Sequence, residues 1–306
     1  MRATCRCWSL SERGGYHPAV RIARLVAAIA VATSMGAAAQ SASGFAGARP
    51  AKGVSSNWAG YAVTEPAGAS FRSVTATWKQ PKVTCGADDA GARSAVWVGL
   101  GGDSPDAHGF EQIGSSSDCS ATTDRPHYYV WHEVWPTPEV VVGQFEIEAG
   151  DTITATVVVN RAATEMAFTI TNRTRGLRFT MRQFVSTPDL SSAEWIVEAP
   201  GCGVGCETPR LANFGSVSFT NIAAVGNDHK GTILDRSWQA TALRLRPSLH
   251  HAYSTGSTAG AAPKALAADG TSFTVAWQPH AISGQPSAPQ PAPKPVSPLI
   301  AGPRRP

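Results

Sequence analysis

The feature that most constrains the fold is a period of two that runs through the middle of the chain. From about Asn57 to Trp277, short runs of alternating apolar and polar residues are separated by Gly, Pro, Asp and Asn, and no amphipathic helix of three turns or more stands out. The candidate strands are Phe71–Trp78, Ser94–Gly99, Phe110–Ile113, His127–Trp135, Gln144–Glu148, Thr152–Asn160, Met166–Thr171, Ala193–Glu198, Ser216–Thr220 and Ser272–Trp277. This number of strands favours an all-β, two-sheet antiparallel sandwich over a small barrel.

The first 39 residues have the layout of a secretory signal peptide. Five arginines precede the apolar run 25–32, and small residues follow it up to Ala39. The apolar run is shorter than the ~20 residues that a membrane-spanning helix needs. We therefore expect residues 1–39 to be removed near Ala39 or Ala42, and the mature chain to be extracellular without a membrane anchor. Residues 40–53, short and rich in small residues, are expected to form a linker or a brief propeptide.

The composition of the C-terminus predicts a disordered tail. Residues 279–306 contain nine of the 22 prolines and no acidic residue, so they cannot bury enough apolar surface to fold. Without both ends, the chain keeps 18 basic and 21 acidic residues, although the whole chain has a formal charge of +4. No basic stripe of the kind that nucleic acid binding requires is present, so we expect no nucleic acid partner.

Four cysteines remain once the signal peptide is removed, namely Cys85, Cys119, Cys202 and Cys206. In an oxidising compartment they are expected to form disulfides, and four thiols allow three pairings. Proximity in the sequence favours Cys85–Cys119 and Cys202–Cys206. Because no paired CxxC elements or histidines stand at ligand spacing, we expect no structural zinc and no other metal or cofactor.

Alternation along the candidate strands predicts which side chains share a face of the sheet. In the segment 127–135, one face carries Tyr129, Trp131, Glu133 and Trp135. A carboxylate is almost never buried unless it is paired, so a face with several aromatic residues and a carboxylate suggests the wall of a cleft. A solvent-facing side with scattered aromatic residues would explain the pattern equally well. In the same way, Gln112 shares a face with Phe110, and Glu198 shares a face with Glu194.

Six segments carry a more specific signal. They are Ser56–Tyr61, Val74–Trp78, Ala95–Gly99, Glu111–Gly114, Tyr128–Pro136 and Ala193–Glu198. In this order, over residues 54–278, they resemble the motifs of the glutamic peptidases, or eqolisins. The resemblance implies a concanavalin-like or jelly-roll sandwich of two large antiparallel sheets with a concave substrate cleft. It also implies a secreted acid endopeptidase that acts on polypeptides as a monomer.

Carried over residue by residue, the resemblance makes Gln112 the catalytic glutamine and Glu198 the catalytic glutamate. Glu194, in the same segment, is the competing carboxylate. The residues that the resemblance places in the substrate cleft are Trp97, Tyr128, Trp131 and Glu133. One departure is Gly101, which stands where fungal members have an aspartate, and Asp103 follows closely in the sequence.

This pair of residue types suits peptide hydrolysis, which needs an activated water, stabilisation of an oxyanion and a proton for the leaving nitrogen. Glu198 would supply the first and the third, and the amide of Gln112 would hold the water and donate to the oxyanion. A carboxylate base with a pKa near ~4.3 is ionised only above that value, and the acids around it are neutral only below it, so an acid optimum is expected. Simpler roles are a sheet-edge hydrogen bond for Gln112 and a surface position for Glu198.

Other chemistries have weaker support. The sequence contains neither a Gly-x-Ser-x-Gly elbow nor an HExxH pair. A carbohydrate-binding or carbohydrate-hydrolysing sandwich, with Glu133 and Glu198 as acid and nucleophile, remains open, as does a catalytically silent binding module. Gln112 separates these hypotheses, because a two-carboxylate glycosidase does not need it.

Overall fold

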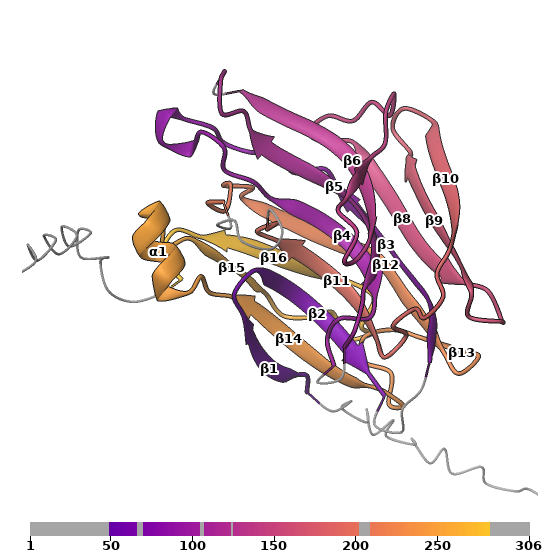
Figure 1. The fold of residues 1–306 in the computed structure, drawn as a ribbon. Helices are drawn as coiled ribbons and strands as arrows, with labels where there is room; N and C mark the ends of the chain where they lie inside the picture. The colour runs from indigo at the N-terminus through magenta and orange to yellow at the C-terminus, as the bar shows by residue number, and fades with distance from the viewer. Residues whose placement is uncertain (1–48, 66–69, 105–106, 124, 202–208, 282–306) are drawn as a thin grey trace, which may run out of the picture. The chain divides into compact units, whose positions relative to one another are not determined.

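The computed structural model describes residues 49–281 except 66–69, 105–106, 124 and 202–208, and these residues lie in one compact unit. They form an almost entirely β structure (Figure 1). Its strands are β1 (Ala51–Ser55), β2 (Trp58–Thr64), β3 (Phe71–Lys79), β4 (Ala95–Leu100), β5 (Glu111–Cys119), β6 (Pro126–Val134), β7 (Val140–Val141), β8 (Thr152–Val159), β9 (Glu165–Asn172), β10 (Leu177–Phe184), β11 (Ser192–Glu198), β12 (Ser216–Gly226), β13 (His229–Gly231), β14 (Gln239–Leu245), β15 (Gly260–Pro263) and β16 (Phe273–Gln278). A 3-10 turn at Ala87–Asp89 and the short helix α1 (Leu249–Thr255) complete it, and no helix in the described ranges is long and apolar enough to cross a membrane.

The strands form two antiparallel sheets that share one strand. The back sheet has the order β10-β9-β8-β3-β12, and the front sheet continues as β12-β16-β15-β14-β2-β11-β4-β5-β6-β7 (Figure 1). β12 pairs with β16 up to Phe219 and with β3 from Thr220 onward, with a register shift next to Asn221, whose φ is 52°. A bulge of this kind bends a strand, so β12 can pass from one sheet to the other. The predicted two-sheet antiparallel sandwich is confirmed, with one parallel pair between β1 and β14.

The main core lies between the two sheets. Buried and partly exposed residues alternate strictly along β8 and β9, as expected for strands with one face in the core. In contrast, every residue of β4 and β5 is buried. The outer face of the front sheet carries a second apolar cluster, which covers the outer side of these two strands. It consists of Ala62, Ala95, Trp97, Trp131, Ile196 and Leu243, with Trp58 and Tyr129 packed against it. The front sheet is therefore covered on both sides at its centre.

Most of the predicted strands are present, with three corrections. The segment Gln144–Glu148 is not a strand, and Gln144 has a φ of 60°, which interrupts an extended chain. β5 extends to Cys119, far beyond the predicted end at Ile113. β1 begins at Ala51, so the sheet includes the last residues of the segment 40–53 that was expected to be a linker or propeptide.

The disulfide between Cys85 and Cys119 is confirmed. It ties the end of β5 to the segment that precedes β4. The predicted Cys202–Cys206 pair lies outside the described residues.

Candidate functional site

The outer face of the front sheet, which we call the site face, brings the predicted residues Gln112 and Glu133 together with Glu194. In the register of the strands, Gln112 on β5 lies opposite Gly99 on β4, and Gly99 lies opposite Glu194 on β11. Glu133 on β6 lies opposite Gln112. Residues paired in this way project their side chains to the same side of a sheet. Because adjacent strands are about 4.8 Å apart, the backbones of Gln112 and Glu194 are separated by roughly 10 Å, with no side chain on Gly99 between them.

Gln112 is held in place by a carboxylate and keeps unused hydrogen-bonding capacity. Its side chain is only 2% exposed. Nε2 donates to Oε2 of Glu133 at 2.5 Å, while Oε1 has no partner among the described residues. One amide N–H and the carbonyl oxygen therefore remain available to a ligand. Burial raises the pKa of Glu133, and the hydrogen bond from Gln112 opposes that effect.

Glu194 is the other unpaired group of this row. It is completely buried, and within the described part of the chain neither carboxylate oxygen has a hydrogen-bond partner. Burial raises its pKa well above the usual value, and the carboxyl groups of Asp103, Asp189 and Glu111 raise it further. A buried, unpaired acid of this kind is a common feature of functional sites, because it costs stability elsewhere.

Glu198 also lies on the site face, but four residues further along β11, where it pairs with Ala95 of β4. Both of its oxygens accept hydrogen bonds from the protein. Oε1 accepts from Nδ2 of Asn57 at 2.9 Å, and Oε2 accepts from Nε1 of Trp97 at 2.7 Å. Burial raises the pKa of Glu198 to about 7, the Trp97 hydrogen bond opposes that effect, and the charge of Glu133 adds to it. In backbone register Glu194 is level with Gln112, whereas the side chain of Glu198 is partly exposed and within reach of the charge of Glu133, the partner of Gln112.

Aromatic side chains fill the site face between these groups. Trp97 is fully buried, and Trp58 packs edge-on against it with ring centroids 5.0 Å apart. Trp131 is 2% exposed and donates from Nε1 to Oγ of Ser116 at 2.9 Å. Trp97, Trp131 and Glu133 thus lie on the face on which the sequence placed them.

Tyr128 does not lie on this face, which corrects its predicted place in the cleft. It packs against the main core between the sheets, and its hydroxyl oxygen accepts from the backbone N–H of Val83 at 3.4 Å. Its neighbour Tyr129 packs against the aromatic cluster and donates to Oδ2 of Asp118 at 3.0 Å. Alternation along β6, which groups Tyr129 with Trp131, predicted which of the two tyrosines lies on the site face.

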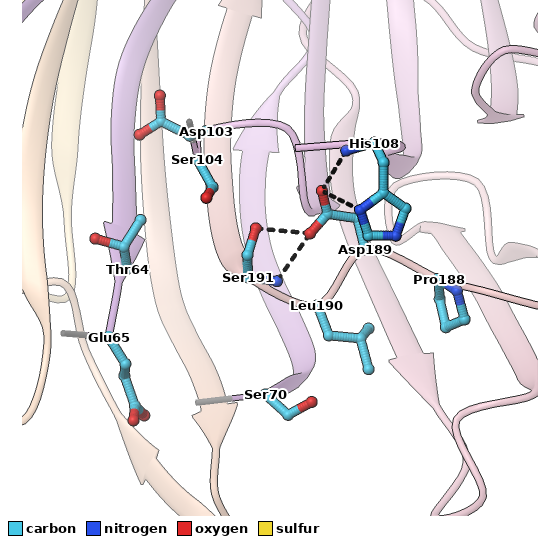
Figure 2. A pocket seen from close by; sticks show the side chains of 10 residues that line it. All are labelled: Thr64, Glu65, Ser70, Asp103, Ser104, His108, Pro188, Asp189, Leu190 and Ser191. Carbon is cyan, nitrogen blue, oxygen red and sulfur yellow. Dashed lines mark hydrogen bonds and ion pairs between the residues drawn. The ribbon is translucent and has the colours of Figure 1, made fainter. Parts of the chain in front are cut away.

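The segment between β4 and β5 folds over one end of the site face, and Asp189 anchors it (Figure 2). Gly101 has a φ of 81°, and a Cβ atom there would lie 2.6 Å from Cβ of Asp189. Asp189 accepts from the backbone N–H of His108 at 3.1 Å and from the hydroxyl of Ser191 at 2.6 Å. Asp189 therefore occupies the space that a side chain at position 101 would need. Sequence reasoning missed it, because its segment belongs to none of the six motifs.

Beside Asp189 is a cavity of about 490 Å³, whose lining includes Thr64, Asp103, His108 and Leu190 (Figure 2). Asp103, noted in the sequence for its position after Gly101, has its pKa raised to about 6 by burial. Its backbone N–H donates to Oγ of Ser192 at 3.2 Å. Asp103 therefore lies at the same end of β11 as Glu194.

Aromatic residues continue from the buried layer to the edge of the site face. Phe110 packs edge-on against Trp58 at 5.9 Å and stacks on Trp135 at 5.8 Å between ring centroids. Gly102 makes this possible, since a Cβ atom there would lie 3.0 Å from the Trp58 ring. Trp135 is 44% exposed, so this series of aromatic residues ends at the surface.

Comparison with known proteins finds one family and several solved structures of similar fold. The model of the Peptidase A4 family matches residues 56–255. Among solved structures, the chain is similar to scytalido-glutamic peptidase with a transition state analog inhibitor, with 22% identity, 73% of this chain and 98% of that chain covered, and a TM-score of 0.57. It is similar to SCP-B, a member of the eqolisin family in complex with the tripeptide Ala-Ile-His, with 23% identity, the same coverage and a TM-score of 0.55. It is also similar to aspergilloglutamic peptidase from Aspergillus niger, with 23% identity, 61% of this chain and 99% of that chain covered, and a TM-score of 0.50. Among curated protein sequences, none matches the chain significantly.

The fold and the family match together define a glutamic-type peptidase, an enzyme whose substrates are polypeptides. The chain belongs to the Peptidase A4 family, whose model covers well over half of it. This assignment replaces the carbohydrate-active alternative that the sequence left open.

Proposed function

We propose that the chain is an exported endopeptidase that cleaves polypeptides at acid pH, with Gln112 and Glu198 acting on the scissile bond. The observation that carries the proposal is that Gln112, whose side-chain oxygen is unpaired within the described residues, is bonded to Glu133, and the charge of Glu133 in turn acts on the partly exposed Glu198. The signal-like segment 1–39 and the Cys85–Cys119 disulfide support export. We expect the mature enzyme to be a monomer without nucleic acid partners.

In this mechanism a water molecule binds between the two side chains. Glu198, as a carboxylate, takes a proton from the water while the water oxygen attacks the carbonyl carbon of the substrate. The oxyanion that forms accepts a hydrogen bond from the N–H of Gln112 that is not bonded to Glu133. Glu198 then gives its proton to the leaving nitrogen, and the C–N bond breaks. Glu133 fixes the orientation of the Gln112 amide throughout.

The choice of Glu198 over Glu194, the other carboxyl group of the motif, rests on two contrasts. The charge of Glu133, the hydrogen-bond partner of Gln112, acts on Glu198, whereas the charges that act on Glu194 are those of Asp103, Asp189 and Glu111. Glu198 is also partly exposed, whereas Glu194 is completely buried. A general base has to reach a water beside both the amide and the substrate, so Glu198 is the better candidate.

The expected acid optimum has a physical reason in the carboxyl groups around the row. Burial raises the pKa of Glu198 to about 7 and also raises the pKa of Glu133, whose charge acts on Glu198. In acid these two carboxyl groups can share a single negative charge, which leaves one of them ionised. As the pH rises through about 7, both groups ionise and repel each other, and we expect activity to fall.

The test is the cleavage of an unfolded protein and of an internally quenched peptide by the purified mature chain at pH ~4 and ~7. We expect cleavage at acid pH, a loss of about 10²–10³ in turnover for Gln112→Ala, and a loss of about 10³ or more for Glu198→Gln. Glu165→Gln, at an exposed ion pair on the back sheet, is the matched control. Full activity of Glu198→Gln beside an inactive Glu194→Gln would give the role of base to Glu194. Absence of cleavage by folded protein at both pH values would reject the peptidase mechanism in favour of a silent binding module.

A further inference from the structure

We infer that Asp189 is a positioning residue for this reaction. Its carboxyl group takes the place of the aspartate that fungal members carry at position 101, and it holds the chain between β4 and β5 over the end of the site face. The inference rests on the proposed function for its effect on catalysis, while the contact itself can be tested without activity. It gives a role to a buried carboxyl group that the mechanism does not use.

The side chain of Asp189 fills the volume that a side chain at position 101 would need. A Cβ atom on Gly101 would lie 2.6 Å from Cβ of Asp189, 2.6 Å from its carbonyl oxygen and 2.9 Å from its Cγ. Atoms in a close-packed interior do not approach one another so closely, so an aspartate at position 101 and one at position 189 exclude each other. The absence of a side chain at position 101 and the carboxyl group at position 189 are therefore linked.

The two oxygens of Asp189 bind different parts of the chain (Figure 2). Oδ1 accepts from the backbone N–H of Ser191 at 3.0 Å and from its hydroxyl at 2.6 Å, which fixes the carboxyl group in a local turn. Oδ2 reaches across to His108, where it accepts from the backbone N–H at 3.1 Å and lies 3.9 Å from Nδ1. The side chain of Asp189 is 2% exposed, so these hydrogen bonds are shielded from water and strengthened.

The chain that Asp189 holds at His108 leads directly into the aromatic wall of the site face. Two residues after His108, the ring of Phe110 packs edge-on against Trp58 and stacks on Trp135. The backbone of Phe110 is fixed as well, because its carbonyl oxygen accepts from the N–H of Trp135 at 3.0 Å. A shift of His108 would therefore move this wall.

The backbone of Asp189 reaches the site by a second route. Its N–H donates to the carboxyl group of Glu111, which directly precedes Gln112 in β5. Asp189 is thus bonded on both sides of Phe110, to His108 before it and to Glu111 after it. A misplacement of about 1 Å near reacting groups can cost about 10² in rate, so the anchor at Asp189 bears on the placement of Gln112.

The kinetic test moves the carboxyl group from position 189 to position 101. We expect Asp189→Ala to lower kcat/KM by about 10², with a lower kcat and a higher KM, because both Gln112 and the aromatic wall shift. Gly101→Asp alone should lose as much, because two side chains then compete for one space. We expect Gly101→Asp/Asp189→Gly to return kcat/KM to within about tenfold of the wild type, since aspartate tolerates the φ of 81° at this position better than most residues do.

The matched control is Gly101→Ala/Asp189→Gly, which relieves the same steric conflict without restoring a carboxyl group. We expect it to stay as impaired as Asp189→Ala. Equal activity of the two double variants would overturn the inference, because relief of crowding alone would then explain the recovery. A Gly101→Asp/Asp189→Gly variant no more active than either single variant would also overturn it, because the two positions would then not exchange one group.

A second measurement does not depend on activity. The backbone amide of His108 should exchange with deuterium at least about tenfold faster in Asp189→Ala, because its acceptor is lost. The control is Asp269→Ala. Asp269 makes the same two bonds to Thr271, 3.0 Å from the backbone N–H and 2.7 Å from the hydroxyl, so this variant loses the same kind of turn at a different place. We expect it to leave the exchange at His108 unchanged.

Asp189→Asn provides the same measurement if Asp189→Ala does not fold. Its amide keeps the volume and can accept from Ser191, but its N–H would face the N–H of His108, so exchange at His108 should again be faster. Unchanged exchange at His108 in either folded variant would refute the contact. If the wild type cleaves nothing but His108 responds as expected, the proposed function fails while the anchoring by Asp189 stands.

Discussion

At the scale of single residues, the site depends on an absent side chain. Gly99 separates Gln112 from Glu194, and its missing Cβ leaves room for the Trp97 ring on one side and for Gln112 on the other. The backbone of Gly99 is extended, with no positive φ, so the constraint is steric and does not come from chain conformation.

We expect Gly99→Ala to lower kcat/KM by about 10² or more while the protein still folds. The added methyl group would meet Cζ3 of Trp97 at 2.9 Å and would force the ring or Gln112 to shift, at a typical overpacking cost of about 1–3 kcal/mol. Steady-state kinetics and thermal unfolding check this. Gly143→Ala, where nothing lies within 4 Å, is the control for the substitution itself. Wild-type kinetics in Gly99→Ala would show that the row needs no such space.

Sequence motifs identified the strands that form the site face. Gln112, Trp131 and Glu133 lie on the site face as predicted. Matching a motif says which strand carries a residue, whereas the groups that surround Glu194 and Glu198 depend on register across three strands. That register is set by contacts far apart in the sequence, so no local pattern contains it.

At the scale of elements, β5 shows why strand ends are hard to predict. Its second half is Ser115-Ser116-Ser117-Asp118, which reads as a loop, yet all four residues are buried. Their hydroxyl groups find partners in distant residues. Oγ of Ser115 donates to Oε1 of Gln80 at 2.6 Å, and Nε2 of Gln80 donates to Oγ of Ser117 at 2.7 Å. Polar residues can thus form a buried strand when another element satisfies them.

Gln80→Ala tests the role of this partner in β5. Gln80 is 1% exposed, and its loss would remove three hydrogen bonds to β5, while Oγ of Ser115 would still accept from Trp78 and Oγ of Ser117 would still donate to the carbonyl of Pro81. At roughly 1 kcal/mol for each lost bond, we expect a loss of about 3 kcal/mol and a fall of roughly 5–10 °C in Tm. The exposed residue Gln239 offers the control, since Gln239→Ala should shift Tm by less than about 2 °C. Equal Tm values for the two variants would contradict the role of Gln80.

At the scale of the whole molecule, the unusual feature is the number of buried acids. Composition showed a slight acidic excess in the folded part, but not which carboxyl groups are inside. None of the ion pairs between described residues involves Glu111, Glu194 or Asp103. Burial raises the pKa of Glu111 to about 8 and that of Asp118 to about 6, in addition to the raised values at Glu194 and Asp103.

These shifts predict that the fold is more stable in acid than at neutral pH. A carboxyl group whose pKa is raised on folding binds its proton more tightly in the folded state, so its contribution is fully present below the unfolded pKa and is lost as pH rises through the folded value. The window of loss therefore runs from about pH 6 to about pH 8. Asp151, Asp235 and Asp269 have lowered pKa values, and their contribution is lost only in stronger acid. We expect a maximum near pH 4–5 and a Tm roughly 10 °C lower at pH 8.

Thermal unfolding of Gln112→Ala across pH 3–8 provides the measurement, since this variant should not digest itself during the scan. Comparison with Gln112→Ala/Glu111→Gln adds a check at one residue. Removing an acid with a folded pKa of about 8 should leave Tm at pH 4.5 nearly unchanged and should reduce the loss between pH 6 and pH 8, because the amide stays neutral throughout. A Tm that stays level or rises from pH 5 to pH 8 would mean that these carboxyl groups are hydrated in solution. It would also remove the physical basis of the acid optimum, because the same burial that raises the pKa values of Glu133 and Glu198 is what limits the site to acid conditions.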